Sequence, residues 1–394
     1  MEKKLALDRG KPVRKEFLPF CRPLIGQEEI DEVVDTLRGD WITTGPKTKQ
    51  FEKEFAGYIG SRFALAVNSA TAGLTLSLAA VGVGPGDEVI TTPMTFAACA
   101  NEIIHRGARP VFVDIEEDTY NIDPAEIKKH ITPRTKAILV VHFAGHPAQM
   151  EEISRIAGEH NLKIIEDAAH ATESVYHGQK IGTISDVTVF SFYATKNLTT
   201  GEGGMVTTND PDLFEKMSIL SLHGMSRDAY KRYSEEGAAH YEVVCPGFKC
   251  NLSDIQSSIG LHQLRKIARL HKRREAIWKK YNQAFGQIEE LKLPTERPNI
   301  LHAYHLYSVL LKSIDRDWFI EALKAEGIGA SIHFISLHLH PYYRKTFGFK
   351  KEDFKVASYV SGRILSLPLY PKMTDEDVED VLCAVKKIVA HKMT

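Results

Sequence analysis

The fold of this chain is decided by the stretch Val187–Asn197, which reads Val-Thr-Val-Phe-Ser-Phe-Tyr-Ala-Thr-Lys-Asn. An apolar run typical of a buried strand ends in a short polar turn that carries Lys196, and Gly201–Gly204 (Gly-Glu-Gly-Gly) then leads into a second apolar run from Met205. A lysine held at a strand end by tight backbone is partly desolvated, which lowers the pKa of its amine and favours Schiff-base chemistry. The alternative is a solvated loop lysine.

A second candidate lies upstream, in the run Lys163–His170 (Lys-Ile-Ile-Glu-Asp-Ala-Ala-His). This run reads as a buried strand that ends in an acid, two small residues and a histidine. Asp167 and Lys196 therefore both follow predicted strands, and such ends converge on the ligand crevice of a mostly parallel sheet. A carboxylate there can keep a pyridinium nitrogen protonated, which makes pyridoxal phosphate an electron sink. A helix N-cap is the alternative role for Asp167.

The third candidate is the turn that follows the apolar run Phe63–Val67 and reads Asn-Ser-Ala-Thr-Ala-Gly over residues 68–73. Its small hydroxylated residues open an amphipathic helix. Free N–H groups at a helix start, together with the hydroxyls of Ser69 and Thr71, suit a phosphate dianion. An ordinary N-cap is the alternative. The turn is neither a Walker loop nor a Gly-x-Gly-x-x-Gly motif, so no nucleotide motif competes for it.

Residues 51–209 alternate between strand-like and helix-like patterns. The runs Thr71–Val81 and Met150–His160 are amphipathic and separate apolar, strand-like runs. This alternation predicts an α/β layered domain with a largely parallel sheet. We expect strands at Phe63–Val67, Glu88–Thr92, Pro110–Asp114, Ala137–His142, Lys163–Glu166, Val187–Phe192 and Met205–Thr208.

The C-terminal third predicts a smaller second domain. Apolar residues recur at helical spacing over Ser253–Phe285, as one long helix or two abutting helices that bridge the domains. Beyond them we expect strands at Tyr304–Leu311 and Ala330–Phe334 and helices at Trp318–Glu326 and Asp375–Ala390. The predicted organisation is an N-terminal arm over 1–20, a large domain over 21–252, and a linking helix with a small domain over 253–394.

The bulk properties exclude several classes of protein. The chain has 394 residues, 43% of them hydrophobic, and a formal net charge of -1. It is long enough for two cores, and its charge gives no attraction to nucleic acid or an anionic membrane, so neither is expected as a partner. No apolar run approaches the roughly 18 residues of a membrane span, and the polar start lacks a signal-peptide core. The five cysteines are scattered, which fits a reduced cytoplasm.

Several motifs occur in a recognisable order. They are Trp41–Pro46 (Trp-Ile-Thr-Thr-Gly-Pro), Ser69–Gly73, Glu166–His170, Ser191 with Lys196 five residues later, Gly203-Gly204 and His333-Phe334. Together they resemble the DegT/DnrJ/EryC1/StrS family of sugar-nucleotide aminotransferases, from about residue 20 to the end. The resemblance implies pyridoxal 5'-phosphate as cofactor and transferase fold type I, with a seven-stranded, mostly parallel sheet domain and a smaller C-terminal α/β domain. Within the family, Trp41–Pro46, Ser69–Gly73 and Ile332–Phe334 look closest to the ArnB branch, which aminates UDP-4-keto-arabinose.

The resemblance assigns the catalytic roles to two residues. Lys196 would hold the cofactor and then move the proton on the substrate carbon, and Asp167 would pair with the pyridine nitrogen. Related dehydratases carry histidine at the lysine position, so Lys196 favours amino transfer.

The resemblance also implies a set of cofactor contacts. Phe96 would stack on the ring, with a core phenylalanine as the alternative. Ser191 and the amides of Ala70 and Thr71 would bind the phosphate. His170 would lie near the ring oxygen, with a capping or core histidine as the alternative.

One segment departs from the family pattern. Many members carry an Asn-x-Arg motif that reaches across a dimer to the phosphate and substrate, whereas this chain has Lys249-Cys250-Asn251. Lysine can still neutralise a phosphate as a point charge. We therefore keep Lys249 and Asn251 as expected cofactor contacts from the neighbouring subunit, with a solvated loop lysine as the alternative.

The substrate side involves aromatic and histidine side chains, which suit uracil stacking and diphosphate hydrogen bonding. The residues expected there are Thr44, His305, His333, Phe334 and Tyr343. The histidine spacing around His338 and His340 could suggest a metal, but no carboxylate or cysteine is near in the sequence, so no metal is expected.

The expected protein is a homodimeric pyridoxal-phosphate aminotransferase with shared active sites. It acts on a nucleotide-linked 4-keto sugar, with UDP as the nucleotide and glutamate as amino donor, in the biosynthesis of cell-surface polysaccharide or lipid A. One alternative is the same chemistry on UDP-4-keto-6-deoxy-N-acetylhexosamine. Another is a non-catalytic regulatory protein on the same fold, against which Lys196, Asp167 and Ser191 argue together.

Overall fold

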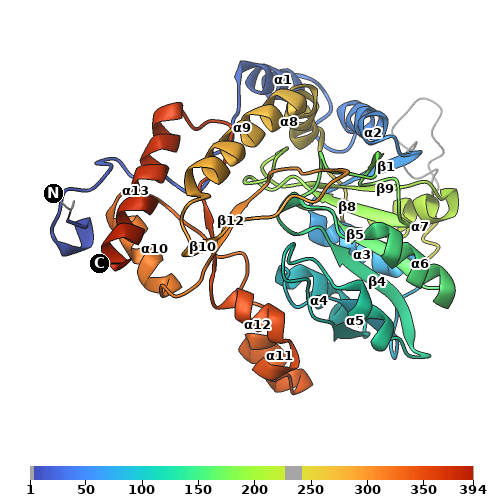
Figure 1. The fold of residues 1–394 in the computed structure, drawn as a ribbon. Coiled ribbons are helices and arrows are strands. Elements are labelled where there is room, and N and C mark those ends of the chain that lie inside the picture. The colour runs from blue at the N-terminus through green and yellow to red at the C-terminus, as the bar shows by residue number, and fades with distance from the viewer. Residues whose placement is uncertain (1–3, 227–241, 394) are drawn as a thin grey trace.

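A seven-stranded sheet forms the centre of the computed structural model, which describes residues 4–226 and 242–393 (Figure 1). Its strand order is β1-β9-β8-β5-β4-β2-β3. The pairs from β8 through β3 are parallel, while β9 runs antiparallel to both of its neighbours. The strands are β1 (Phe63–Val67), β2 (Glu88–Thr91), β3 (Arg109–Phe112), β4 (Thr135–Val141), β5 (Lys163–Asp167), β8 (Val187–Ser191) and β9 (Gly204–Thr208). All seven strands predicted within residues 51–209 are confirmed.

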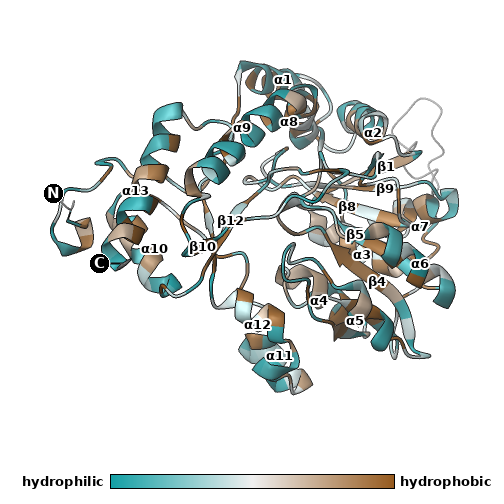
Figure 2. Ribbon diagram, in the orientation of Figure 1, coloured by the Kyte–Doolittle hydropathy of each residue, from teal (hydrophilic) through white to brown (hydrophobic). Residues whose placement is uncertain are grey.

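Helices cover both faces of this sheet, which explains why its strands read as continuous apolar runs (Figure 2). One core cluster joins the sheet to α3 (Ala70–Ala80), α4 (Ala97–His105) and α7 (Pro211–Ser221). The cluster on the opposite face includes residues of α2 (Pro46–Ile59), α5 (Pro124–Lys129), α6 (Met150–His160) and α8 (Asp254–Arg265). Along β1, Ala64 and Ala66 belong to one cluster and Leu65 and Val67 to the other. The result is the three-layer α/β arrangement predicted for the large domain.

The second body is built on the three-stranded sheet β10-β12-β13. Its core also takes in Leu5 and Leu18 of the N-terminal arm. Its elements are α9 (Ile267–Phe285), β10 (Leu291–Lys292), β12 (Tyr307–Leu311), α10 (Arg316–Ala325), α11 (Pro341–Phe347), α12 (Lys355–Ser361), β13 (Ile364–Leu367) and α13 (Asp375–Met393). A further sheet pairs β11 (Ile300–Leu301) with the hairpin β6 (Val175–Tyr176) and β7 (Gln179–Lys180) of the large body.

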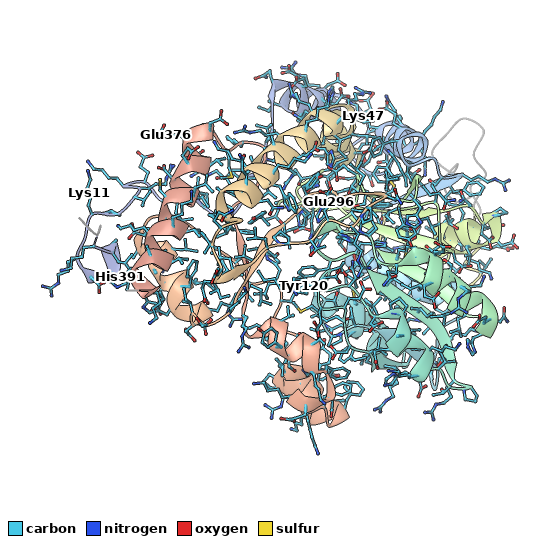
Figure 3. The ribbon with its side chains drawn as sticks, viewed as in Figure 1. Lys11, Lys47, Tyr120, Glu296, Glu376 and His391 are labelled. Atoms are coloured by element: carbon cyan, nitrogen blue, oxygen red, sulfur yellow. The ribbon has the colours of Figure 1, made fainter. Side chains whose placement is uncertain are left out.

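The N-terminal arm binds along this second body rather than projecting from it. Both oxygens of the buried Glu326 carboxylate accept backbone N–H groups of the arm, from Ala6 and Val13, each at 2.9 Å. Asp8, in the short helix η1 (Ala6–Asp8), pairs with His391 at 3.4 Å. Figure 3 accordingly shows Lys11 and His391 at the same end of the molecule.

Two abutting helices, α8 and α9, connect the bodies, as one of the two sequence alternatives predicted. Helix α8 packs against α1 (Gln27–Arg38) and α2 of the large body. The division at residue 252 stays a prediction, and the packing of the large body continues beyond it through α8.

The strand predicted at Ala330–Phe334 is wrong. That segment makes one isolated bridge, from Ser331 to Ser366, and no ladder. The strand that pairs with β12 in register is β13, which the sequence analysis did not predict. Its one bridge is to Ser366 on the edge of β13 that β12 leaves free, and beyond this residue the segment leaves the sheet and lies beside the cavity described below.

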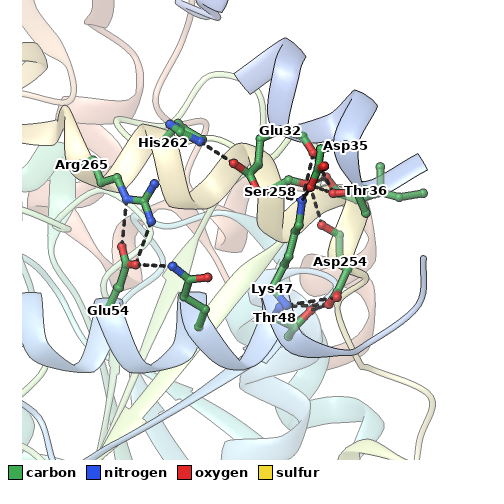
Figure 4. A network of polar contacts seen from close by, with 12 residues as sticks. Glu32, Asp35, Thr36, Lys47, Thr48, Glu54, Asp254, Ser258, His262 and Arg265 are labelled. Atoms are coloured by element: carbon green, nitrogen blue, oxygen red, sulfur yellow. Dashed lines mark hydrogen bonds and ion pairs between the residues drawn. The ribbon is translucent and has the colours of Figure 1, made fainter. Parts of the chain in front are cut away.

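A polar network ties α1, α2 and α8 together (Figure 4). The buried Asp254 carboxylate accepts from the N–H groups of Gly45 and Thr48 at 2.7 and 2.9 Å and from the Thr48 hydroxyl at 2.6 Å. Nearby, Lys47 pairs with Glu32 at 2.7 Å. The Trp-Ile-Thr-Thr-Gly-Pro segment is therefore held by a residue that lies about two hundred positions away in the chain.

Asp254→Ala is expected to lower the free energy of unfolding by roughly 2–4 kcal/mol, because it leaves several buried donors without an acceptor. The matched control is Asp35→Ala, since Asp35 is an exposed partner of Lys47 and its loss costs at most about 0.5 kcal/mol. Urea unfolding of the three proteins measures both values. Equal losses for the two variants would show that Asp254 does not stabilise this junction.

Candidate active site

A cavity of about 490 Å³ opens at the carboxyl ends of β5 and β8, where a ligand crevice is expected in such a sheet. It lies between the start of α3, the start of α4 and the segment 332–334. The residues from the sequence analysis that line it are Ala70, Thr71, Phe96, Asp167, His170, Ser191, Lys196, His333 and Phe334. The structure thus brings residues of α3, in the large body, together with His333 and Phe334 from the C-terminal part of the chain.

Lys196 enters the cavity from a tightly bonded turn after β8. Its N–H donates to the Tyr193 carbonyl at 2.9 Å, and Phe192 donates to the Gly203 carbonyl at 2.9 Å. A side chain at Gly204 would meet the Ala70 nitrogen at 2.8 Å, so only glycine lets the start of α3 approach this turn. Burial lowers the pKa of the Lys196 amine to about 8, although the charge of Asp167 opposes this change. Lys196 is therefore a nucleophilic amine held in place.

Asp167 ends β5 and faces the cavity with its carboxylate held by two donors. The N–H of Ala169 donates to Oδ1 at 3.0 Å, and the Cys99 thiol donates to Oδ2 at 2.9 Å. Cys99 is fully buried, and burial together with the Asp167 charge raises the pKa of its thiol well above the ordinary value. The sequence analysis missed this contact, since Cys99 read only as one scattered cysteine. The one sequence feature that could have indicated this contact is the position of Cys99, three residues after Phe96 at the start of α4.

The turn at Ser69 begins α3 at the cavity. Ser69 caps α3, and its hydroxyl accepts from the Ala72 N–H at 3.1 Å. The N–H groups of Ala70 and Thr71 belong to the first helical turn, which has no intrahelical acceptors for them. Ser191, at the end of β8, lies on the same wall of the cavity. The N-cap interpretation is therefore confirmed, and the start of α3 lines the cavity, while phosphate binding by its first N–H groups stays a prediction.

The remaining walls are aromatic. Phe96 precedes α4 and is 65% exposed, so its ring is available to a ligand. His170 lies parallel to Phe334, with ring centroids 6.1 Å apart, and its Nδ1 accepts from the Ala144 N–H at 3.3 Å. Burial lowers the pKa of His170 well below the ordinary value and that of His333 to about 4. Both imidazoles are therefore neutral at pH 7.

Five expected site residues do not line the cavity in the described part of the chain: Thr44, Lys249, Asn251, His305 and Tyr343. Asn251 donates to the Thr44 hydroxyl at 2.6 Å, and Lys249 is exposed. Tyr343 is buried and donates to Asn101 at 2.6 Å. His305 is buried behind His170. Thr44, His305 and Tyr343, which were predicted on the substrate side, thus contact other protein groups and do not face the cavity.

Neither a metal-binding cluster nor a membrane-spanning helix occurs in the described part of the chain. Within residues 4–226 and 242–393, there is no cluster of three or more histidine, cysteine, aspartate or glutamate side chains that could hold a metal ion. In the same ranges, no helix is long and apolar enough to cross a bilayer.

The groups that line the cavity fit pyridoxal phosphate. A lysine of lowered pKa suits its aldehyde, a fixed carboxylate suits its ring nitrogen, and the start of α3 suits its phosphate. The aromatic ring of Phe96 suits its flat face. We find no buried group in the cavity that opposes this assignment among the residues described.

Comparison with known proteins gives the same assignment. The sequence pattern of the DegT/DnrJ/EryC1/StrS aminotransferase family matches residues 23–386. The spore coat polysaccharide biosynthesis protein SpsC of Bacillus subtilis is 52% identical over 381 residues, which cover 95% of this chain and 98% of SpsC.

Solved structures are similar over nearly the whole chain. The putative sugar aminotransferase Spr1654 of Streptococcus pneumoniae is 36% identical in its PMP form, with a TM-score of 0.90 over 96% of this chain and 100% of Spr1654. Its PLP form gives a TM-score of 0.89. DesI, solved in the presence of its TDP-sugar product, is 29% identical, with a TM-score of 0.88 over 100% of this chain and 98% of DesI.

Proposed function

Because the chain belongs to the DegT/DnrJ/EryC1/StrS aminotransferase family and is a pyridoxal-phosphate-dependent sugar aminotransferase, we propose that it converts a nucleotide-linked 4-keto sugar to the 4-amino sugar. UDP is the proposed nucleotide and glutamate the proposed amino donor. The observation that carries the proposal is the single cavity in which Lys196, Asp167 and the start of α3 meet. The TDP-sugar product in whose presence DesI was solved and the polysaccharide biosynthesis named for SpsC support it.

In this proposal the cofactor is held from four sides. The first N–H groups of α3 and the Ser191 hydroxyl bind the phosphate. Asp167 places its negative charge beside the ring nitrogen, and Phe96 covers one face of the ring. His170 Nδ1 accepts a hydrogen bond from the Ala144 N–H, so the ring proton is on Nε2, where it can be donated to the ring oxygen of the cofactor.

The chemistry divides between the cofactor and the chain. Pyridoxal phosphate, when bound, accepts the amino group and spreads negative charge over its ring. Lys196 takes and returns a proton at Nζ, and a pKa of about 8 keeps both of its protonation states accessible near neutral pH. Glutamate and the sugar use this one cavity in turn.

A single-turnover assay tests the proposed substrate class. The enzyme, loaded with pyridoxamine phosphate, is mixed with UDP- and TDP-linked 4-keto sugars, including the 4-keto pentose of the ArnB branch and the rival 4-keto-6-deoxy-N-acetylhexosamine. A 4-keto sugar should restore the visible absorption of pyridoxal phosphate within one turnover. A protein that exchanged amino groups only between amino acids and 2-keto acids would contradict the proposal.

We also propose that two chains form a homodimer with shared sites. Helix α1 exposes Ile30, Val34 and Leu37 at helical spacing, and Trp41 and Ile42 continue this apolar surface. An apolar stripe of this kind on a surface helix supports an interface. Lys249 is exposed and does not line the cavity of its own chain, so the proposed phosphate contact comes from the neighbouring chain.

Mixing two inactive variants tests the shared site. Lys196→Ala and Lys249→Glu are each expected to be inactive or nearly so, and a heterodimer of the two has one intact site. Refolding them together in equal amounts should restore roughly a quarter of wild-type activity, because half of the dimers are mixed and each has one working site. Lys196→Ala refolded alone is the control. Differential tagging shows whether heterodimers have formed. If they have formed and the mixture is still inactive, each chain holds its own complete site.

A further inference from the structure

A buried series of hydrogen bonds begins at Asn197, the residue after Lys196. The Asn197 amide nitrogen donates to Glu173 Oε2 at 2.9 Å and to the Ala303 carbonyl at 2.8 Å. The Asn197 amide oxygen contacts His305 Nδ1 at 3.0 Å. Asn197, Glu173 and His305 are all buried. None of these contacts was predicted, because they join segments that lie up to 108 positions apart.

These contacts determine where the protons lie. Two oxygen acceptors fix the Asn197 nitrogen on one side, so its oxygen must face His305. His305 Nδ1 therefore carries the proton and donates it. Burial, together with the neighbouring His170 and Lys196, lowers the pKa of His305 well below the ordinary value, so its imidazole is neutral and its Nε2 is unprotonated.

Ring packing extends this series of contacts from His305 to His170 in the cavity wall. The His305 and His170 rings lie 4.4 Å apart between centroids at an angle of 31°. The backbone on either side is tied together, since the N–H of Ala303 donates to the Gly145 carbonyl and that of His305 to the Ala144 carbonyl. His170 is thus fixed by the Ala144 N–H at Nδ1 and by the His305 ring against its face.

Two features show that the backbone around His305 and His170 is constrained. Ala144 and Tyr304 both adopt left-handed conformations, with φ of 58° and 49°, which non-glycine residues rarely do. The Tyr304 hydroxyl donates to Glu296 at 2.7 Å, and Figure 3 shows Glu296 in the middle of the molecule. The segment that carries His305 is therefore held from both sides.

Glu173 is the last residue in this series of hydrogen bonds, and it does not line the cavity. It is 3% exposed, and its Oε1 has no hydrogen-bond partner among the described residues. Burial raises the pKa of its carboxyl group, although the nearby charges of His271 and Arg274 oppose this change. The contact of Glu173 with Asn197 is the hydrogen bond accepted at Oε2, and charge on the partnerless Oε1 would be costly to bury.

We propose that Glu173 is a positioning residue of the active site, which orients Asn197 beside Lys196 and, through His305, holds His170 with its Nε2 proton toward the cofactor ring. The proposal rests on the proposed cofactor contacts of His170. It does not depend on which sugar the enzyme uses. Glu173 acts through one accepted hydrogen bond and not through its charge.

Two variants of nearly equal volume separate these roles. Glu173→Gln keeps an oxygen that can accept from Asn197, whereas Glu173→Met fills the space without an acceptor. Pyridoxal phosphate is titrated into each cofactor-free protein, and the pH dependence of its visible absorption is recorded without any sugar. Glu173→Gln should bind within about threefold of wild type, while Glu173→Met should bind about tenfold more weakly and shift the absorption midpoint.

The outcomes are distinct. Glu173→Met with wild-type affinity and midpoint would overturn the proposal, and so would equal impairment of the two variants, which would indicate a role for the charge. Asn197→Leu, which removes the same hydrogen bonds from the other side, should shift the midpoint in the same direction and decides the matter should Glu173→Met not fold. A wild-type protein without any visible band would instead contradict the cofactor site itself.

Discussion

Lys196→Ala should lower turnover of the sugar substrate by at least about a thousandfold while the protein stays folded, because it removes the group that moves the proton. Burial sets the pKa of this amine at about 8, so roughly one amine in ten is uncharged at pH 7 and can act as a nucleophile. Turnover should therefore rise with pH toward the pKa of Lys196. Initial rates and circular dichroism of the variant measure the two parts of the expectation.

Lys180 offers a matched control. Burial also lowers the pKa of Lys180 to about 8, but this lysine lies over the Tyr58 ring, outside the cavity walls. Lys180→Arg keeps the cation on the ring and should leave turnover near the wild-type value. Borohydride should fix the cofactor to a peptide that contains Lys196 in the wild type. Attachment at another lysine, or full activity of Lys196→Ala, would remove Lys196 from the proposed role.

The parts of the site that the sequence predicts are those encoded by local pattern. Lys196, Asp167 and the turn at Ser69 each follow an apolar run at once, and a strand that ends at a polar turn is visible within ten residues of sequence. Parallel pairing of those strands then brings the three turns to one edge. The fold and the walls of the cavity were therefore predictable together.

The parts that the sequence does not predict depend on contacts between distant segments. Cys99 reaches Asp167 from a helix 68 positions upstream, and nothing in its local sequence marks it. His305 has the composition of a pocket residue, yet Asn197 and His170 hold it behind the wall. The predicted strand at Ala330–Phe334 failed for a similar reason, since it makes only one bridge, to Ser366 of β13, more than thirty residues later. Local periodicity does not show whether such a distant pairing continues into a ladder.

Asp167→Asn is expected to retain cofactor and to lose most of the rate. The amide keeps the size of the carboxylate but not its negative charge, which in this proposal stabilises the protonated ring nitrogen. Loss of such fixed electrostatic support costs about 3 kcal/mol in the barrier, or roughly a hundredfold in rate. The amide also has one oxygen in place of two, so it cannot accept from both the Ala169 N–H and the Cys99 thiol.

Two measurements separate the charge from these neighbouring contacts. Cys99→Ser keeps a donor beside Asp167 and should hold kcat within about tenfold of the wild type, whereas Asp167→Asn loses its charge and should not. Bound cofactor, measured after release in alkali, should remain near one per chain in both variants, so that a lower kcat reports chemistry and not occupancy. An Asp167→Asn protein with unchanged kcat would place the ring nitrogen away from Asp167. The ring nitrogen would then need another anionic group, and among the described residues that line the cavity the one other carboxylate is that of the exposed Glu202.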